Sequence, residues 1–357
     1  MPRPPQRRGW ASRTVSARAR THAAPPPLRW DGARLHVLDQ TLLPEREEIV
    51  ALTGASDTAD AIRRLVVRGA PLIGVVAGYG LAMEVAAEPG LGALERGAEQ
   101  LRSARPTAAN LAWALDRVAG AAAAAGPAAL AGAARAEAEA IEAENAAAGA
   151  ALSERGADLL GGTTRVLTHC NTGALACGAR SSALGVIMAM ADRDPGLHVL
   201  VCETRPLLQG ARLTTWELAR AGISHELIVD AAAAGLIRAR EAGAVVVGFD
   251  RMAANGDTAN KVGTYGHALA ARAAGIPFVF AGPRSSIDAS LRGGEEISIE
   301  ERDGDEVRRA GGALLTIEGT RVRNPAFDVT PAELVWALVT ERGVARPVTV
   351  ESIAAVA

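Results

Sequence analysis

The stretch over residues 244–264 contains the side chains best suited to chemistry. It opens with the apolar run AVVVG, which predicts a strand buried on both faces, as in a parallel sheet. Asp250 follows this run, and we expect Asn260 and Lys261 in the first turns of a helix that begins near Thr258. A carboxylate at a strand end, beside a lysine and free helix N–H groups, suits an anionic ligand and proton transfer. The alternative is a surface loop in which Asp250 is a simple cap.

Cysteines end two other apolar runs. Cys170 is followed by Asn-Thr-Gly-Ala, a turn of small residues that leads into a helix. A thiol at a helix N-terminus has a lowered pKa and can act as acid, base or nucleophile. The alternative is a buried structural cysteine, and the same two interpretations apply to Cys202. Cys177 is expected within a helix and in the core.

Two arginines and a glutamine are candidates for ligand binding. Arg68 and Arg105 lie at breaks between predicted helices, beside small residues and proline, where a side chain and free N–H groups can meet a phosphate. Each is also compatible with an ordinary surface arginine. Gln209 opens a predicted helix, where it can bond a sugar hydroxyl or only cap the helix.

The second half of the chain supplies the elements that must position these residues. Short apolar runs alternate there with helical segments, the pattern of a doubly wound parallel sheet. The five runs are residues 164–170, 197–203, 223–230, 244–250 and 276–282. Ligands bind outside the carboxyl ends of such strands. We therefore expect two thiols and three carboxylates, those of Glu203, Asp230 and Asp250, to gather at one edge of the sheet.

The first half has a different pattern. Residues 28–43 predict a hairpin with its turn at Asp31-Gly32, and helical segments follow from Ser56 onward. The alanine-rich run over 120–160 is helical by propensity. The predicted division is a smaller, mainly helical N-terminal domain with a short hairpin (27–150) and a Rossmann-like C-terminal domain (151–357). Residues 1–26 are rich in arginine and hold no acidic residue, and they predict a disordered extension. A transit or nucleic-acid-binding tail is the alternative.

Composition narrows the class of function. The 357-residue chain is 49% hydrophobic and only 3% aromatic, and its net charge of −2 gives no electrostatic case for nucleic acid or an anionic membrane. Three cysteines without CxxC spacing suit a reducing cytosol. No apolar run is expected to reach the roughly 18 residues of a membrane span. The chain lacks HExxH, and no GxGxxG or P-loop fingerprint follows a strand, so we expect neither a metal nor a nucleotide cofactor.

Six long segments resemble the methylthioribose-1-phosphate isomerase family, which is related in fold to the regulatory subunits of the translation-initiation exchange factor. They are RGAPLIG (68–74), ARPTAANLAWALDR (104–117), THCNTGALA (168–176), ETRPLLQGARLTTWEL (203–218), GFDRMAANGDTANKVGTY (248–265) and NPAFDVTPAELVWALVTERGV (324–344). The resemblance covers about residues 28–345, with the motifs in the expected order. A departure follows the cysteine motif, where the family's Gly-Tyr-Gly-Thr run is replaced by Ala176-Cys177-Gly178-Ala179-Arg180-Ser181. This replacement affects substrate detail more than the class of reaction.

The resemblance implies a cytoplasmic homodimer that isomerises an aldose 1-phosphate without metal or cofactor. The implied reaction converts 5-methylthio-D-ribose 1-phosphate to 5-methylthio-D-ribulose 1-phosphate in methionine salvage. Cys170 matches the family's catalytic cysteine and Asp250 its general acid. The matches to substrate-binding positions are Arg68, Gly69, Ala70, Arg105, Gln209, Asn260 and Lys261.

The chemistry explains these residue types and leaves the hydrogen-transfer route open. The phosphate blocks the anomeric oxygen, so ring opening needs an acid at the ring oxygen, and Asp250 suits this role if its pKa is raised. Hydrogen then passes from C2 to C1, either as a proton removed by a Cys170 thiolate or as hydride beside a polarising thiol. The alternative functions are the same chemistry on 5-deoxyribose 1-phosphate or ribose 1,5-bisphosphate, and a non-catalytic regulatory subunit that binds a sugar phosphate or nucleotide.

Overall fold

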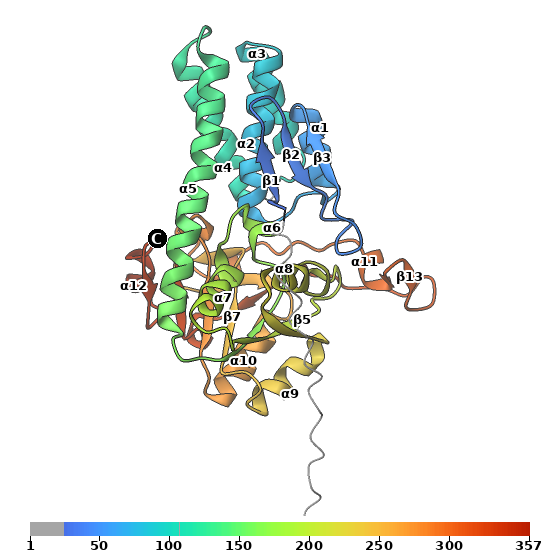
Figure 1. Ribbon diagram of the computed structural model, residues 1–357, viewed down its shortest axis with the longest axis vertical. Helices are drawn as coiled ribbons and strands as arrows, with labels where there is room; N and C mark the ends of the chain where they lie inside the picture. Colours follow the sequence, from blue (N-terminus) through green and yellow to red (C-terminus); the bar gives the residue numbers. More distant parts are fainter. Residues whose placement is uncertain (1–24, 107) are drawn as a thin grey trace, which may run out of the picture.

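The computed structural model describes residues 25–106 and 108–357 and shows two regions stacked along the long axis of the molecule (Figure 1). The N-terminal region is a helical bundle with a small sheet beside it. The C-terminal region is a sheet with helices on both faces. This arrangement confirms the predicted fold class. The predicted extension over 1–26 falls almost wholly outside the described residues.

The small sheet begins with the predicted hairpin. Its antiparallel strands are β1 (Leu28–Trp30), β2 (Leu35–Leu38) and β3 (Ile49–Leu52). Asp31 forms the turn because its Oδ1 accepts hydrogen bonds from the N–H groups of Ala33 at 2.9 Å and Arg34 at 2.8 Å. Leu35 and Val37 point into the helical core, so the alternation seen in the sequence sets which face of the sheet is buried.

Five helices make the bundle, and the second is its centre. They are α1 (Ala55–Arg63), α2 (Ala70–Ala87), α3 (Leu91–Arg102), α4 (Ala109–Ala125) and α5 (Leu130–Leu159). An added Cβ at Gly74 would lie 2.9 Å from the Asn110 carbonyl oxygen, and one at Gly80 would lie 2.7 Å from Oγ1 of Thr58. These glycines therefore let α4 and α1 approach α2 closely.

The apolar composition of α2 corrects one expectation from the sequence. Its 18 residues have a mean hydropathy of 1.6, so the helix is long and apolar enough to cross a membrane. Within the bundle, however, 72% of that window is buried. A helix that is hydrophobic on all sides is typical of a protein core as well as of a membrane span. Its burial at the centre of the bundle accounts for its composition.

The C-terminal sheet contains all five predicted strands side by side. Its order is β16-β15-β10-β7-β4-β5-β6, and all neighbours are parallel except β15 and β16. The strands are β4 (Arg165–Thr168), β5 (His198–Cys202), β6 (Ser224–Ile228), β7 (Ala244–Val247), β10 (Phe278–Ala281), β15 (Ala337–Val339) and β16 (Val344–Ala345). From β4 the chain proceeds to β5 and β6 on one side, and it then returns to β7 and β10 on the other. The direction of winding therefore reverses between β4 and β7, where doubly wound folds bind their ligands.

Alternating side chains cover the two faces of this sheet. Val166 and Val246 pack in one apolar layer with α7 (Ser182–Arg193), whereas Leu167 and Val245 pack in a second layer with α10 (Thr264–Ala274). Other elements of this region are α6 (Ala174–Cys177), a π-helical turn (Gly210–Thr214), α8 (Thr215–Ala221), α9 (Ala233–Arg238) and α12 (Val350–Ala354). Short 3-10 turns cover Asp230–Ala232, Arg284–Ser286, Gly294–Glu296 and Ala332–Leu334. Burial on both faces explains why the central strands β4, β5, β7 and β10 read as continuous apolar runs.

One helix belongs to both regions. α5 extends from the top of the N-terminal region down beside the C-terminal region in Figure 1, with Ile141 in the N-terminal core and Leu152 in the C-terminal core. The predicted boundary between residues 150 and 151 falls inside this helix. The division into two domains stays a prediction, and α5 joins the two regions without a linker.

A second sheet corrects the predicted helix at Thr258. Its order is β11 (Ile287–Asp288), β8 (Arg251–Ala253), β9 (Thr258–Lys261) and β14 (Phe327–Thr330). Asn260 and Lys261 lie in β9, which pairs antiparallel with β8 and with β14. The local sequence showed only the turn after β8. The partner β14 comes from some 70 residues further on, so its pairing was not visible in the sequence around Thr258.

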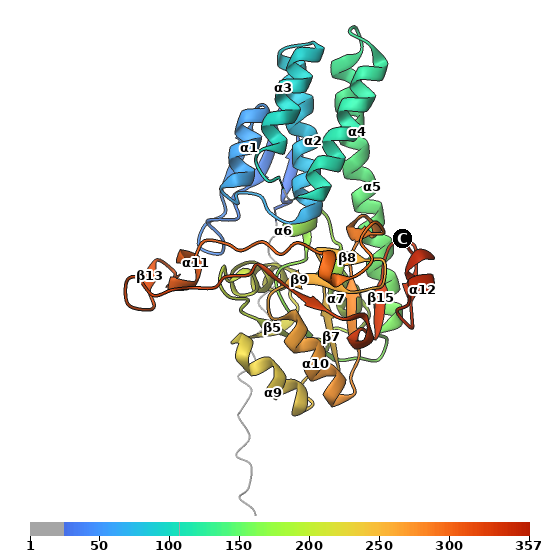
Figure 2. The ribbon, with the colours of Figure 1, turned by 180° about the vertical axis from the view of Figure 1, so that it is seen from behind.

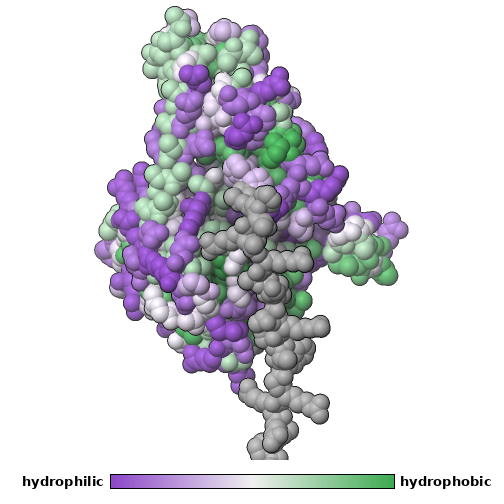
Figure 3. Space-filling model, viewed as in Figure 1, coloured by the Kyte–Doolittle hydropathy of each residue, from purple (hydrophilic) through white to green (hydrophobic). Residues whose placement is uncertain are grey.

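A narrow arm projects from the body near the junction of the two regions (Figures 1 and 2). It contains α11 (Asp305–Arg308), β12 (Arg309–Ala310) and β13 (Ala313–Leu314). The exposed fractions of Leu314, Leu315 and Ile317 are 47%, 58% and 80%. Figure 3 shows the hydrophobic surface at this tip.

Candidate active site

Cys170 lies on a tightly held loop two residues beyond β4. Its φ of 68° is in the left-handed region, which costs a non-glycine residue on the order of 1–3 kcal/mol. The Cys170 N–H donates to Oγ1 of Thr204 at 2.8 Å, and its carbonyl accepts from Oγ1 of Thr214 at 2.7 Å. These two bonds hold the backbone in the strained conformation and leave the half-buried thiol in a fixed place.

Asp250 lies shortly beyond the end of β7, the strand that pairs with β4. Its N–H donates to the carbonyl of Ala259 at 3.0 Å, which ties the loop to β9. The residue as a whole is exposed at the surface. Desolvation of the carboxyl by the protein atoms around it raises its pKa, while the positive charges of Lys261, Arg105 and Arg68 act in the opposite direction. The raised pKa supports the role of a proton donor.

The thiol of Cys170 differs from the sequence-based expectation in its ionisation. Burial raises its pKa, opposed by the positive charges of Arg68 and Lys261 and reinforced by Asp250. The expectation of a lowered pKa was wrong because the following helix, α6, begins only at Ala174. A helix terminus acts within about one turn, so burial dominates at Cys170. The neutral thiol is therefore the main form near pH 7.

Arg68 reaches across from the N-terminal region to the Cys170 loop. Its Nη2 donates to the carbonyl of Asn171 at 3.3 Å and also to Oδ1 of the same residue. Next to it, Gly69 has φ 91°, and an added Cβ would collide with the backbone of Ala176. Glycine thus lets the start of α2 approach α6, the helix that follows the Cys170 loop. Ala70 begins α2, where the first N–H groups lack intrahelical partners.

The remaining predicted binding residues offer polar groups from three further elements. Lys261 is only 7% exposed, with its Nζ 5.2 Å from the centre of the Phe327 ring, and Asn260 donates to Oγ1 of Thr264 at 2.9 Å. Gln209 is 5% exposed, and its Oε1 has no hydrogen-bond partner among the described residues. Arg105 lies half-buried between α3 and α4. Buried polar groups of this kind are usually satisfied, so the free acceptor of Gln209 is suited to a ligand.

Two of the strand-end residues have structural contacts instead. Cys202 is fully buried, and its thiol lies 3.7 Å from Nε2 of His267. Asp230 accepts the N–H groups of Thr204 at 2.8 Å and Arg205 at 2.7 Å. Both thiols and all three carboxylates lie at the carboxyl ends of neighbouring parallel strands, as expected, but Cys202 and Asp230 contact other protein groups there. Asp230 supports the loop that holds Cys170, while Cys202 packs beneath it.

A buried group of two histidines and a cysteine lies behind the Cys170 loop. The ligand atoms of His169, Cys202 and His267 lie within 4.8 Å of one another. However, Nε2 of His169 is 2.9 Å from the carbonyl oxygen of Val262, next to Lys261. Burial lowers the pKa of His169 to about 4 and that of His267 to about 3, so both rings are neutral near pH 7. We interpret His169, through its contact with Val262, as connecting the Cys170 loop to the end of β9.

Sequence reasoning missed the residues that hold the Cys170 loop. Thr204, Thr214 and Asn171 all bond to that loop or to each other, and Glu217 lies beneath them. Thr204 and Glu217 fall within the segment 203–218 noted above. Their proximity to Cys170 depends on the pairing of β4 with β5 and was not visible locally.

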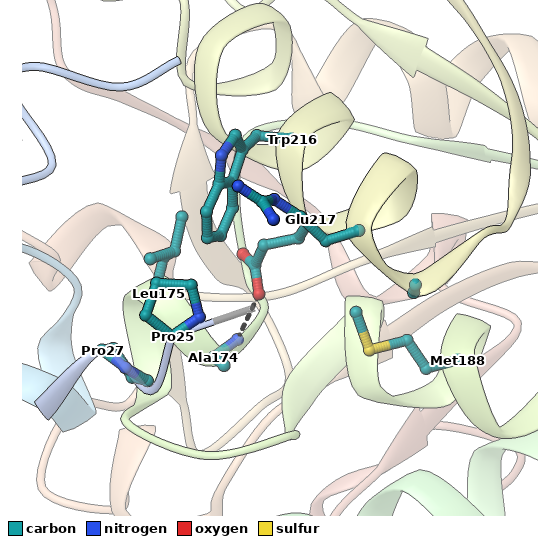
Figure 4. A pocket seen from close by; sticks show the side chains of 9 residues that line it. Pro25, Pro27, Ala174, Leu175, Met188, Trp216 and Glu217 are labelled. Atoms are coloured by element: carbon teal, nitrogen blue, oxygen red, sulfur yellow. Dashed lines mark hydrogen bonds between the residues drawn. The ribbon is translucent and has the colours of Figure 1, made fainter. Parts of the chain in front are cut away.

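Two well-formed cavities in the described part of the chain lie next to the candidate site and do not include Cys170 or Asp250 in their lining. One, of about 290 Å³, lies behind the Cys170 loop and is lined in part by Leu175, Trp216 and Glu217 (Figure 4). The other, of about 310 Å³, lies between α2, α4, α5 and the loop after β10. We define the candidate site by its side chains.

The chain belongs to the initiation factor 2 subunit family, whose family model matches residues 66–347. Within it, the chain is 47% identical over 320 residues to methylthioribose-1-phosphate isomerase of Alcanivorax borkumensis, covering 89% of this chain and 92% of that protein. It is also 48% identical to 5-deoxyribose 1-phosphate isomerase of Moorella thermoacetica, covering 92% of this chain and 97% of that protein.

Two solved structures share the fold. 5-Methylthioribose 1-phosphate isomerase of Pyrococcus horikoshii superposes with a TM-score of 0.88 at 36% identity, covering 93% of this chain and 95% of that one. The delta subunit of translation initiation factor eIF-2B from A. fulgidus gives 0.84, also at 36% identity, covering 92% and 99%. Because proteins titled as an isomerase and as an initiation factor share one architecture, the fold alone does not decide the activity.

Proposed function

We propose that this chain is an aldose–ketose isomerase that converts 5-methylthio-D-ribose 1-phosphate to 5-methylthio-D-ribulose 1-phosphate, a step of methionine salvage. The observation that carries the proposal is the placement of Cys170 and Asp250 on the adjacent strand ends of β4 and β7, with Arg68 and Lys261 acting on both groups. The relatives at about 47% identity that bear this enzyme's name support it.

Asp250 is the proposed acid for ring opening. Its raised pKa favours the protonated form, which gives its proton to the ring oxygen while the bond from that oxygen to C1 breaks. The electron-deficient C1 that results can accept hydrogen from C2. The phosphate stays on C1 throughout, so the product is the ketose 1-phosphate.

Cys170 is the proposed neighbour of C2 and O2. In one route a hydride, with its electron pair, moves from C2 to C1, and the O2 proton returns to the Asp250 carboxylate as the C2 carbonyl forms. In the other, a Cys170 thiolate removes the C2 proton and an enediolate-like intermediate takes it up at C1. The raised pKa of Cys170 favours the hydride route. Turnover in D₂O separates the two, because only the proton route can bring solvent deuterium to C1.

The remaining predicted residues are proposed to bind the substrate. Arg68, Arg105 and Lys261 supply positive charge for the phosphate, and the free N–H groups at the start of α2, beside Gly69 and Ala70, add hydrogen-bond donors. Gln209 and Asn260 are proposed to bond the sugar hydroxyls.

A second candidate differs only at C5 of the sugar. The Moorella thermoacetica relative, which is named 5-deoxyribose 1-phosphate isomerase, is as similar in sequence as the others. Comparing kcat/KM for 5-methylthioribose 1-phosphate, 5-deoxyribose 1-phosphate and ribose 1,5-bisphosphate decides between them, and we expect the highest value for the first. A higher value for 5-deoxyribose 1-phosphate would change the proposed substrate and leave the reaction type standing.

The proposed assembly is a cytoplasmic homodimer whose partners are small sugar phosphates and neither nucleic acid nor membrane. Exposed apolar side chains support a protein–protein interface. The exposed fraction is 51% for Leu227 on the edge strand β6 and 58% for Val229 just beyond it, and the arm tip is apolar as well. The net charge of −2 gives no support for nucleic-acid binding. Light scattering after gel filtration tests the homodimer, and a monomer at micromolar concentration would contradict it.

A further inference from the structure

Glu217 is a buried carboxylate that the proposed reaction does not use. It lies on α8, is 5% exposed and forms none of the ion pairs found in the described part of the chain. Burial raises the pKa of its carboxyl, opposed mainly by hydrogen bonds from Asn171 and Ala174. An ionised carboxylate in such a place is costly unless its hydrogen bonds are made. Its contacts therefore indicate what it does.

Both carboxylate oxygens of Glu217 point to the Cys170 loop. Oε1 accepts from Nδ2 of Asn171 at 2.7 Å, and Oε2 accepts from the N–H of Ala174 at 2.7 Å. Figure 4 shows the second contact, with Glu217 reaching from α8 to the start of α6. The space between is full, because an added Cβ at Gly173 would collide with the same carboxylate.

Asn171 connects Glu217 to Arg68 of the N-terminal region. Its Nδ2 is held by Glu217, so its Oδ1 is turned to the guanidinium of Arg68, from which it accepts a hydrogen bond. Asn171 is 2% exposed, so it has no freedom to turn elsewhere. A direct Glu–Arg pair would neutralise the arginine. With a neutral amide between them, the carboxylate orients Arg68 while much of its positive charge stays available to an anion.

We propose that Glu217 is a positioning residue for the phosphate site, acting through Asn171 to fix the guanidinium of Arg68 beside Cys170. This inference rests on the proposed function for the identity of the anion, a sugar phosphate. The contacts among the three residues are independent of which sugar is used.

The first test is the pair Glu217→Gln and Asn171→Ala, alone and together. Glutamine can still accept from Ala174 through its Oε1, but its Nε2 faces the amide donor of Asn171. The substitution therefore breaks only the chain of contacts from Glu217 through Asn171 to Arg68, which we call the relay. We expect each single variant to raise KM, and the Ki of inorganic phosphate as a competitive inhibitor, about tenfold, with a smaller fall in kcat. Because both substitutions break one relay, the double variant should be no weaker than Asn171→Ala alone.

Thr340→Val is the matched control for a merely structural effect. Thr340 is fully buried and donates to the Val356 carbonyl at 2.8 Å, far along the chain from the relay. It should lower the melting temperature without changing KM or the phosphate Ki. A Ki in Glu217→Gln within twofold of the parent, or single effects that multiply in the double variant, would overturn the proposal.

Asn171→Asp provides a second readout if Glu217→Gln does not fold. The new carboxylate would pair directly with Arg68, so phosphate binding should weaken at least tenfold in a folded protein. Unchanged phosphate binding there would overturn the relay. Phosphate affinity measured by calorimetry does not depend on turnover. A parent protein that binds phosphate but leaves every sugar phosphate unchanged would therefore contradict the proposed function and leave the relay to be judged on its own.

Discussion

Cys170 and Cys202 come from neighbouring parallel strands, yet their surroundings are opposite. β4 pairs with β5 in parallel, and Cys202 ends β5 while Cys170 lies two residues beyond β4. Burial raises the pKa of both thiols. At Cys170 the positive charges of Arg68 and Lys261 oppose this effect, whereas at Cys202 the negative charges of Asp230 and Glu203 add to it. Of these two thiols, only Cys170 therefore has positively charged neighbours that suit an anionic substrate.

The difference shows that a strand end is not enough to make a functional residue. The chain continues past β4 for two residues before Cys170, which has a positive φ and is half-buried. Cys202 is still within its strand, facing the buried ring of His267. Placement at the switch point and the approach of cations from other elements separate the two thiols.

The largest expected effect comes from Cys170→Ser. If the thiol acts on C2 and O2, kcat should fall by at least about 10³-fold, toward the upper part of the range for positioned proton-transfer groups. The change is nearly isosteric, so the melting temperature should stay within a few degrees of the parent. Steady-state kinetics with a coupled assay measure the loss. Turnover near the parent value would remove Cys170 from the mechanism.

Asp250→Asn comes next and tests the acid that shares the site with Cys170. An amide cannot protonate the ring oxygen, so kcat should fall about 10²- to 10⁴-fold. In the parent, kcat/KM should fall as the pH rises through the pKa of Asp250, because the protonated form is the active one. Since that pKa is raised, the fall lies at higher pH than for an ordinary carboxyl. A pH–rate profile with no such limb would contradict the assignment.

Lys261→Met should have an intermediate effect that appears in two measurements. Loss of a charge-assisted contact to phosphate should raise KM about tenfold or more. Removing the positive charge should also raise the pKa of Cys170 further, so iodoacetamide should label Cys170 more slowly at a given pH. Labelling is followed by mass spectrometry of the Cys170 peptide. An unchanged labelling rate would mean that the two side chains do not interact.

The smallest effect on activity is expected from Cys202→Ala. The buried thiol packs against His267 and faces no proposed substrate group, so kcat/KM should stay within about threefold of the parent. Stability should fall by about 1 kcal/mol, typical of a lost buried contact. Urea unfolding measures the loss. A kcat/KM as low as that of Cys170→Ser would abolish the distinction between the two cysteines.

The sequence was informative where periodicity and local turns determine structure. The hairpin at Asp31 and five strands of the C-terminal sheet were predicted because burial on one or both faces leaves a regular apolar pattern. Lys261 was placed in a helix because its strand partner, β14, lies far along the chain. The roles assigned to Cys170 and Asp250 came from the resemblance and stay predictions.

The residues that hold the Cys170 loop in place could not be predicted from the sequence, for a related reason. Glu217 reads in the sequence as one more polar residue of a helix, and its contact with Asn171 exists only because α8 packs under the Cys170 loop. The pKa of Cys170 was predicted with the wrong sign because the sequence showed a nearby helix start and not the extent of burial.

The most direct test of the joint role of Cys170 and Asp250 is a proton and phosphorus NMR assay with 5-methylthioribose 1-phosphate and a metal chelator present. Parent, Cys170→Ser and Asp250→Asn proteins are run side by side, after circular dichroism has shown all three to be folded. We predict ketose 1-phosphate from the parent alone. A folded parent that leaves the substrate unchanged, or either variant turning over at the parent rate, would contradict the account.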